Sequence, residues 1–347
     1  ATTTRYVSIQ LGIGGLQPIA AADVCRAGFG DCKGLSNYTR AMLNELGISS
    51  VYTAISTDNE RLLPDFSSAN QMNHVILQVP LPGDTLWLEC TNPQLPFGYI
   101  HSDIAGHDAL LVTPDGGKLH RLPSYPDSLN TQTTIAQITL TPTGGAKVKA
   151  CETSRLFQYE NMIGITHLEP ARQKDHLRSN INLVQANISD VQITEKKDAI
   201  PQIALQYAVD TEQYGNKTGN RLFIPANIFR KGFITPELKQ RIQDVHINYG
   251  YLDTDSILLQ IPEGYAIESL PKSYKAENNF GTFSSSLQVK GKEIYIVHRL
   301  LMHKGVYPKE SYKDFLEFRK QIAGQYNSKI ILKKEVLPAR GGTPSDG

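Results

Sequence analysis

The chain has 347 residues, of which 40% are hydrophobic and 20% are charged, and its formal net charge at pH 7 is +1. This composition is that of an ordinary globular protein and excludes disorder, collagen and coiled coil as the main organisation. The charge balance gives no electrostatic footprint for nucleic acid. No apolar run approaches the roughly 20 residues that span a bilayer. The length predicts two or three domains.

The chain starts at Ala1 and reaches a strand-like run, Arg5–Gln10, almost at once. We therefore interpret it as a processed or truncated piece of a longer protein, whose missing N-terminal part is expected to pack on the core. A glycine-rich loop, Gly12–Gly15, follows the run. It lacks the third glycine of a dinucleotide loop and the lysine of a phosphate loop, so we expect this loop and Gln17 to line a cleft.

A helix is predicted directly after Gly28–Lys33. One helical face is formed by residues that recur at steps of three and four: Leu35, Tyr38, Thr39, Met42, Leu43 and Leu46. Asp31 is the predicted N-cap, and Gly47 is the predicted end. Cys32 then lies in the first turn, where the helix dipole and unpaired N–H groups favour a thiolate and could hold an oxyanion. The alternative is a cysteine that only packs under the glycine-rich turn.

The other three cysteines have simpler interpretations. Four cysteines are too few for a disulfide scaffold in a chain of this length, and no C-x-x-C pair indicates a zinc ribbon. Cys25, Cys90 and Cys151 are expected to be packed side chains. For Cys25 and Cys90 a resolving thiol is the alternative.

A β-hairpin is predicted from two strands, Asn73–Val79 and Thr85–Cys90, joined by a turn centred on Leu81–Pro82. In that register His74 faces Glu89, and the apolar residues of both strands share the opposite face. A carboxylate beside an imidazole fixes its tautomer and stabilises the imidazolium. The alternative is a cross-strand pair that only stabilises the sheet.

One further polar group lies after the hairpin. It contains two histidines and two aspartates that could ligate a metal ion: His101, Asp103, His107 and Asp108. Such residues in a polar loop are ordinarily solvated, and no calcium loop is visible. We therefore expect no metal and no cofactor.

A cluster of Pro, Gly and Ser residues between Thr113 and Ser128 is the predicted domain boundary. Beyond it, strand-like runs are separated by turns rich in Gly, Pro and Asn, which predicts a mostly antiparallel β-sandwich with inserted helices. The predicted parts are a core (1–126), a β-rich region (127–338) and a disordered tail (339–347). The β-rich region lacks a cluster of nucleophile, base and carboxylate, so we expect it to supply binding surface or spacing but no catalytic group.

Three motifs follow in the order cysteine, histidine, carboxylate. Gly30-Asp-Cys-Lys33, with its helix, resembles the cysteine motif of the transglutaminase-like superfamily, and Asn73-His-Val75 resembles its histidine motif. Trp87-Leu-Glu-Cys-Thr-Asn-Pro93 occupies the place of the third motif, which is usually Leu-Asp-Pro-Thr. The resemblance covers about residues 5–125 and points to multi-domain bacterial envelope proteins with flanking β-rich domains. Two departures are the glutamate in place of aspartate and the missing helix before the first strand.

The resemblance implies a role for each motif residue. Cys32 would be the nucleophile, His74 the general base and acid, and Glu89 the orienting carboxylate. Tyr6 and Gln17 are candidates for donating a hydrogen bond to the oxyanion, and for Tyr6 a core aromatic is the alternative. Candidates for the substrate cleft are Asp31, Asn73 and Trp87.

The implied fold is α+β, with a papain-like, transglutaminase-type core followed by the mostly antiparallel β-sandwich. The implied chemistry is acyl transfer through a thioester on peptide or isopeptide bonds of a peptide or protein substrate, with hydrolysis as the first choice and protein crosslinking as the second. The alternative is a catalytically inactive envelope module that binds or acts as a scaffold. The resemblance also implies the periplasm or cell surface of a Gram-negative bacterium.

Overall fold

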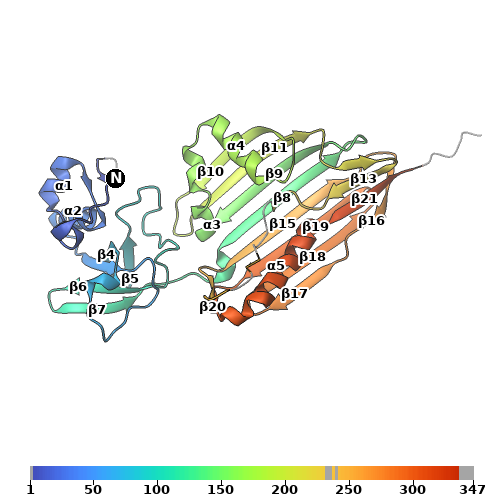
Figure 1. The fold of residues 1–347 in the computed structure, drawn as a ribbon. Helices are drawn as coiled ribbons and strands as arrows, with labels where there is room; N and C mark the ends of the chain where they lie inside the picture. Colours follow the sequence, from blue (N-terminus) through green and yellow to red (C-terminus); the bar gives the residue numbers. More distant parts are fainter. Residues whose placement is uncertain (1–2, 231–236, 239–240, 336–347) are drawn as a thin grey trace, which may run out of the picture. The chain divides into compact units, whose positions relative to one another are not determined.

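The computed structural model describes residues 3–230, 237–238 and 241–335. These residues form a mixed α+β fold with large, mostly antiparallel sheets (Figure 1), as the sequence predicts. Among them, no helix is both long and apolar enough to cross a membrane. The predicted tail, 339–347, lies outside the described residues.

The chain folds into two compact units. The first unit comprises residues 1–126 together with two later segments, 155–163 and 195–202. Both later segments come from the stretch that the sequence analysis assigns to the β-rich region. The remaining residues form the second unit.

The first unit is built on a five-stranded antiparallel sheet with the strand order β5-β4-β3-β6-β7. Its strands are β3 (Val51–Ile55), β4 (His74–Leu81), β5 (Asp84–Leu88), β6 (Asp108–Thr113) and β7 (Gly116–Arg121). Two short strands pair in parallel beside it, β1 (Arg5–Tyr6) and β2 (Phe29–Gly30). The helices of this unit are η1 (Gly12–Gly15), α1 (Ala21–Ala27), α2 (Cys32–Glu45), η2 (Ala69–Gln71) and α3 (Phe157–Glu160).

Helix α2 forms as its sequence predicts. The side chain of Asp31 caps it by accepting a hydrogen bond of 2.9 Å from the backbone N–H of Gly34. Past its end, Gly47 takes the left-handed φ of +73° that favours glycine. Leu43 on the helix packs against the apolar face of the β4–β5 hairpin, formed by Leu77, Val79 and Leu88. This contact fixes the helix relative to the hairpin.

The turn of the β4–β5 hairpin differs from the prediction by one residue. It is centred on Pro82–Gly83 and not on Leu81–Pro82. Gly83 has a φ of +77°, and proline followed by a glycine with positive φ is the pattern of a type II turn. The pairing is therefore two residues out of the predicted register, and Glu89 is not directly opposite His74. Because side chains alternate with a period of two, a shift of two keeps both residues on one face.

The second unit contains an eight-stranded sheet with the order β10-β11-β9-β8-β15-β19-β18-β17. Strands β8 and β15 run parallel, whereas β8–β9, β15–β19, β18–β19 and β17–β18 are antiparallel. The strand bounds are β8 (Thr131–Leu140), β9 (Ala146–Arg155), β10 (Asn187–Lys196), β11 (Gln202–Thr211), β15 (Tyr251–Gln260), β17 (Tyr274–Asn278), β18 (Gly281–Lys290) and β19 (Glu293–Met302).

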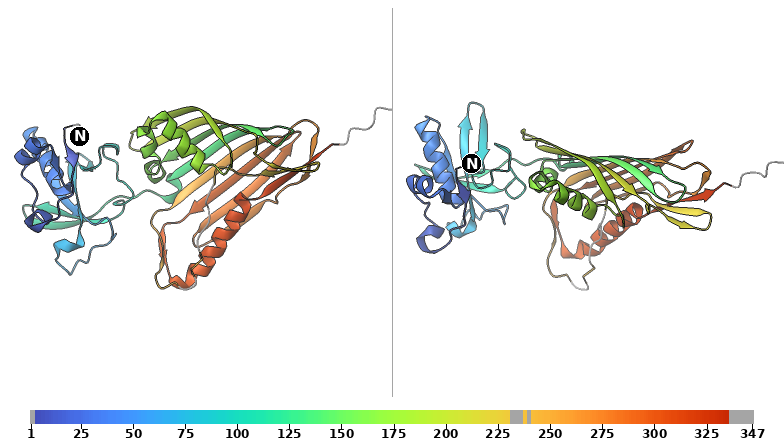
Figure 2. Two further views of the ribbon diagram at one scale, coloured as in Figure 1. Left: turned by 45° about the horizontal axis from the view of Figure 1, so that its top comes forward. Right: turned by 90° about the horizontal axis from the view of Figure 1, so that it is seen from above.

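Two smaller sheets and several helices complete this unit. A four-stranded sheet has the order β12-β13-β21-β16, and β14 pairs with β20. Their bounds are β12 (Asn216–Thr218), β13 (Arg221–Pro225), β14 (Val245–Ile247), β16 (Tyr265–Ser269), β20 (Gly305–Tyr307) and β21 (Lys329–Lys334). The helices are η3 (Asp127–Leu129), η4 (Ile163–His167), α4 (Pro170–Asn180), η5 (Lys309–Ser311) and α5 (Tyr312–Tyr326). Figure 2 shows α4 and α5 on the same face of the large sheet.

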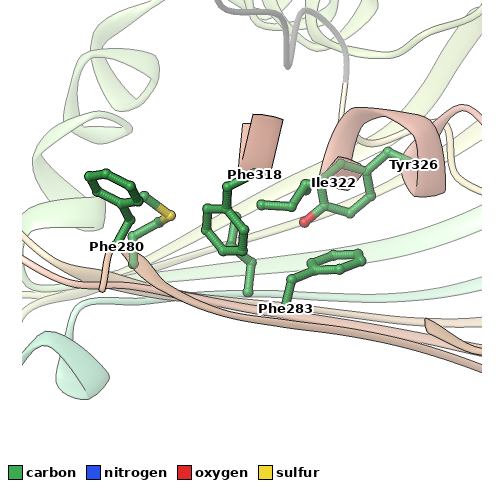
Figure 3. Packing of buried hydrophobic residues seen from close by; sticks show 7 residues of the cluster. Phe280, Phe283, Phe318, Ile322 and Tyr326 are labelled. Carbon is green, nitrogen blue, oxygen red and sulfur yellow. The ribbon is translucent and has the colours of Figure 1, made fainter. Parts of the chain in front are cut away.

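Helix α5 packs on the large sheet through an aromatic core (Figure 3). Phe318, Ile322 and Tyr326 recur every four residues, so one face of the helix presents all three. They meet four residues from β18, β19 and the turn before β18, namely Phe280, Phe283, Leu300 and Met302. None of the seven is more than 3% exposed, so the helix contributes substantially to burial of apolar surface in this unit.

A buried polar cluster surrounds Arg230 in the second unit. Its guanidinium donates hydrogen bonds to Asp253 (2.9 Å) and Asp255 (2.7 Å), both on β15. Burial raises the pKa of Asp253 to about 6, although the charge of Arg230 opposes that shift. Burial also acts to raise the pKa of Asp255, but its contacts with Arg230 prevail and lower it. Removing one partner from such a group would leave a buried charge unpaired.

We expect Phe318→Ala to lower the free energy of unfolding by about 3–5 kcal/mol, because truncation of a buried aromatic removes its transfer energy and leaves a cavity. Denaturant unfolding followed by circular dichroism measures the change. The matched control is Lys313→Ala, at an exposed position of the same helix, which should stay within about 0.5 kcal/mol of the wild type. Equal effects of the two substitutions would contradict this account of the core.

Candidate active site

Cys32 occupies the first position of helix α2. Its side chain is buried, with 3% exposure, and Asp31 holds the helix start through the cap described above. The first-turn backbone N–H groups lack partners within the helix. Cys32 is therefore placed at the positive end of the helix dipole, beside N–H groups that could bind an oxygen atom of a substrate.

His74, at the start of β4, connects the cysteine to a carboxylate. Its Nε2 lies 2.7 Å from Oε2 of Glu89, which directly follows strand β5. Cys32 borders the same cleft as His74, and its interaction with the imidazole helps to raise the pKa of His74. The structure thus brings Cys32 and His74 to one cleft and His74 within hydrogen-bonding distance of Glu89, in spite of the shifted hairpin register.

Both oxygens of the Glu89 carboxylate have several hydrogen-bonding partners. Oε2 also lies 3.2 Å from Nε2 of His101. Oε1 accepts hydrogen bonds from the backbone N–H of Thr91, at 2.7 Å, and from its hydroxyl. His101 was considered only as a metal ligand at the level of sequence, and its contact with Glu89 was missed. No local pattern signals that contact, because the loop that carries His101 has to return to the hairpin.

The environment of His74 favours the charged imidazolium. Burial lowers the pKa of His74, but hydrogen bonds with Cys32 and Glu89 and the negative charge of both outweigh burial and raise it to about 9. Burial likewise acts to raise the pKa of Glu89. Hydrogen bonds from His101, His74 and Thr91, with the charge of His74, overcome that effect and hold the pKa far below its ordinary value. The carboxylate is therefore ionised across the physiological range.

A cleft of about 150 Å³ opens beside Cys32 and His74. Part of its lining comes from the glycine-rich loop and the segment before β4, through Gly15, Leu16, Ala69, Met72 and Asn73. Asn73, a predicted cleft residue, therefore borders it. The other two cleft candidates lie elsewhere: Asp31 is buried at the helix cap, where it contacts Lys33, and the ring of Trp87 packs on His120.

The predicted oxyanion donors do not line this cleft. Tyr6 pairs with Gly30 in the β1–β2 ladder and is 46% exposed, and Gln17 is an exposed residue after η1. Gln10 and Tyr52 border the cleft in their place. Burial, with the charges of Cys32 and Asp31, raises the pKa of Tyr52, so its hydroxyl keeps its proton.

Gln10 had a usable signal in the sequence, because it ends the strand-like run before the glycine-rich loop. Tyr52 had none, since it lies within an ordinary strand.

The four residues considered as possible metal ligands, and expected to be solvated, do not come together as one cluster. His107 is buried and its Nδ1 bonds the carbonyl oxygen of Ser56 at 2.7 Å, while Asp108 pairs with Arg121. A different set, His74, Glu89 and His101, has its nitrogen and oxygen atoms within 4.8 Å of one another, a spacing that a metal ion could also use. Its two N···O distances are those of hydrogen bonds, and we interpret it as a hydrogen-bonded group.

All four cysteines are free thiols. Cys25 is exposed, whereas Cys90 and Cys151 are partly buried. Burial raises the pKa of Cys90, which makes it less reactive at neutral pH. Cys25 therefore provides an internal reference for the reactivity of an exposed thiol.

Comparisons with known proteins give a family match within the second unit and a similar fold. Residues 220–332 match a family described as a domain of unknown function, DUF3858. The comparison with curated proteins finds no match. A crystal structure from Parabacteroides distasonis, described as that of a putative protease, is similar over 96% of this chain with a TM-score of 0.54 and 11% identity. Such a likeness shows the fold alone. This chain covers 49% of that protein, about half its length.

We expect Glu89→Gln to lower the pKa of His74 from about 9 toward its ordinary value of about 6.5. The substitution removes one of the two groups that stabilise the imidazolium, leaving Cys32 and the burial that disfavours the charge. NMR titration of the imidazole resonances measures the shift. The matched control is Glu45→Gln, at the exposed end of α2, which should leave the pKa of His74 unchanged. A value that stays near 9 in Glu89→Gln would show that another group holds the charge.

The same pKa shift has a consequence for stability. A histidine whose folded pKa is raised contributes stability that is fully present below its unfolded value of about 6.5. That contribution is lost as the pH rises through about 9, the folded value of His74. The wild type should therefore lose more stability than Glu89→Gln between these two pH values.

Proposed function

We propose that the first unit is a transglutaminase-like core and that Cys32, His74 and Glu89 are its catalytic triad. The proposed activity is acyl transfer on peptide or isopeptide bonds through a thioester. The observation that carries the proposal is the 2.7 Å contact between His74 and the buried carboxylate of Glu89, beside a cleft that His74 borders together with Cys32. The fold shared with a protein described as a putative protease agrees with it.

The first half of the reaction forms the thioester. The Cys32 thiolate attacks the amide carbonyl carbon, and the carbonyl oxygen takes up the negative charge. N–H groups in the first turn of α2, with Gln10 and Tyr52, are the proposed donors to that oxygen. As the C–N bond breaks, the His74 imidazolium gives its proton to the leaving amine. Glu89 holds the ring in the required orientation.

The second half releases the acyl group. Neutral His74 takes a proton from water, and the resulting hydroxide attacks the thioester carbonyl carbon. The C–S bond breaks, the carboxylic acid leaves, and the Cys32 thiolate and His74 imidazolium are restored. If a lysine amine takes the place of water, the product is a crosslink, which is the second choice. The periplasm or cell surface of a Gram-negative bacterium is part of the proposal and rests on the resemblance of the motifs.

At pH 7 we expect iodoacetamide to alkylate Cys32 faster than Cys25, although Cys25 is exposed and Cys32 is buried, because a thiolate is the reactive form. Peptide mass spectrometry measures both rates in one sample, with and without a chelator. His74→Gln should slow the labelling of Cys32 by roughly 100-fold, the low end of what a positioned acid–base group contributes. Cys25→Ser is the matched control and should leave the rate at Cys32 unchanged.

If Cys32 reacts no faster than Cys25 or Cys90, the triad does not activate the thiol. That result would favour the alternative of a binding or scaffold module. With a reactive Cys32, fluorogenic peptide and isopeptide substrates should place an acyl group on Cys32 that mass spectrometry detects, and Cys32→Ala should abolish turnover.

The pH dependence of alkylation gives a further test. Because His74 stays charged up to about pH 9, we expect a thiolate–imidazolium pair near neutral pH. The rate at Cys32 should therefore rise at a pH well below about 8.5, where a free cysteine ionises. In His74→Gln the rise should move up to that pH or above. A single rise at or above about pH 8.5 in the wild type would contradict the ion pair.

A further inference from the structure

A short helix from the β-rich half of the chain enters the first unit next to the proposed triad. Helix α3 follows β9 in sequence, yet it belongs to the first unit. Its anchoring residues, Phe157 and Tyr159, are at most 4% exposed. The ring of Tyr159 lies edge-on to Tyr99, and that of Phe157 lies edge-on to Tyr125.

The last residue of α3, Glu160, is bonded to the segment that carries His101. Its Oε1 accepts hydrogen bonds from the hydroxyl of Tyr99 at 2.6 Å and from the backbone N–H of Ser102 at 2.9 Å. Its Oε2 accepts a bond of 2.6 Å from the hydroxyl of Ser102. Both oxygens are thus committed to residues on either side of His101.

His101 is in turn held toward the triad carboxylate. Its imidazole is 12% exposed, and Nε2 lies 3.2 Å from the Glu89 oxygen that also contacts His74. The carbonyl oxygen of His101 accepts backbone bonds from Ile104 and Ala105, at 3.2 and 3.0 Å. The backbone around His101 is therefore fixed by hydrogen bonds to residues before and after it. On the side of the triad, its imidazole contacts Glu89.

We propose that His101 is a positioning residue that orients Glu89 toward His74, and that Glu160 fixes His101 in turn. The proposal rests on the proposed function. A hydrogen bond donated by Nε2–H of His101 fixes the rotation of the Glu89 carboxylate. It also takes the place of a water molecule at Oε2, the oxygen that contacts His74. The β-rich half of the chain then supplies a residue on which the geometry of the triad depends, in addition to the binding surface or spacing that the sequence predicts for residues 131–334.

The test uses His101→Ala and His101→Gln in the full chain. The alanine variant should lower the alkylation rate of Cys32 at pH 7 roughly 10-fold, the effect of one lost hydrogen bond to a charged group. It should also move the pH at which the rate rises toward that of a free thiol. Glutamine places an amide N–H near the position of Nε2 and should restore most of the rate, which a role in packing alone would not predict.

Glu160→Gln and Ser102→Ala test the second step, with folding checked by circular dichroism. Both should slow alkylation in the same direction as His101→Ala, by a smaller factor. The matched control is Glu195→Gln, because Glu195 accepts a hydrogen bond of 2.6 Å from Tyr159 on the same helix and, among the described residues, makes no hydrogen bond to the 99–102 segment. It should leave the rate unchanged. If Glu160→Gln does not fold, Ser102→Ala decides whether Glu160 fixes His101, because it removes only one of the three hydrogen bonds to Glu160.

Two results would overturn the proposal. One is a wild-type rate and pH profile in His101→Ala, and the other is an equal loss in Glu195→Gln and Glu160→Gln. The failure of the proposed function is distinguishable, because then Cys32 is unreactive already in the wild type. In that case NMR of the His74 imidazole still reports on positioning: its ring resonances should shift in His101→Ala and recover in His101→Gln, and unchanged resonances in His101→Ala contradict the proposal.

Discussion

The carboxylate of Glu89 has to stay charged in a place that water barely reaches. Its side chain is 6% exposed, and an ion there costs several kcal/mol unless donors replace its hydration. Those donors come from the start of β4, from Thr91 just beyond the hairpin, and from His101. The requirement explains why three separate segments converge on one side chain. It also explains why the hairpin ends where it does, because β5 stops immediately before the residue that has to turn toward them.

Local signals were enough for the parts of the site that lie close together in sequence. The start of α2 follows from Asp31 and the helical spacing after Cys32, and both faces of the hairpin follow from alternation. The register of the hairpin could not be predicted, because Pro80, Pro82 and Gly83 are compatible with two positions of the turn. The choice between them depends on the positive φ of Gly83, which the sequence alone does not determine. Side chains of a strand alternate between its faces with a period of two residues, so the error of two residues still places His74 and Glu89 on the same face.

Contacts between distant segments could not be predicted. Tyr52 and Gln10 reach the cleft only because β3 and the glycine-rich loop meet in three dimensions. Strand-like runs beyond the domain boundary were expected, but the parallel pairing of β8 with β15 joins segments more than a hundred residues apart. Asp253 and Asp255 occupy alternate positions on β15, as solvent-facing charges would. Both are instead buried in ion pairs with Arg230. Alternation of apolar and polar residues identifies a strand and its two faces. Whether a charged residue on that strand is buried depends on a distant residue of opposite charge, which alternation does not reveal.

The path of the chain through α3 sets the order in which the molecule is completed during synthesis. Domains ordinarily fold as units, with the N-terminal one first, as the ribosome adds about 5–20 residues per second. Here Cys32, His74 and Glu89 leave the ribosome well before Glu160, and β8 and β9 are made between them. For several seconds the nascent chain therefore carries the thiol without the carboxylate that braces the 99–102 segment. Residues 3–126 of the first unit are translated before the second unit, but the first unit is completed only after strands of its neighbour have been made.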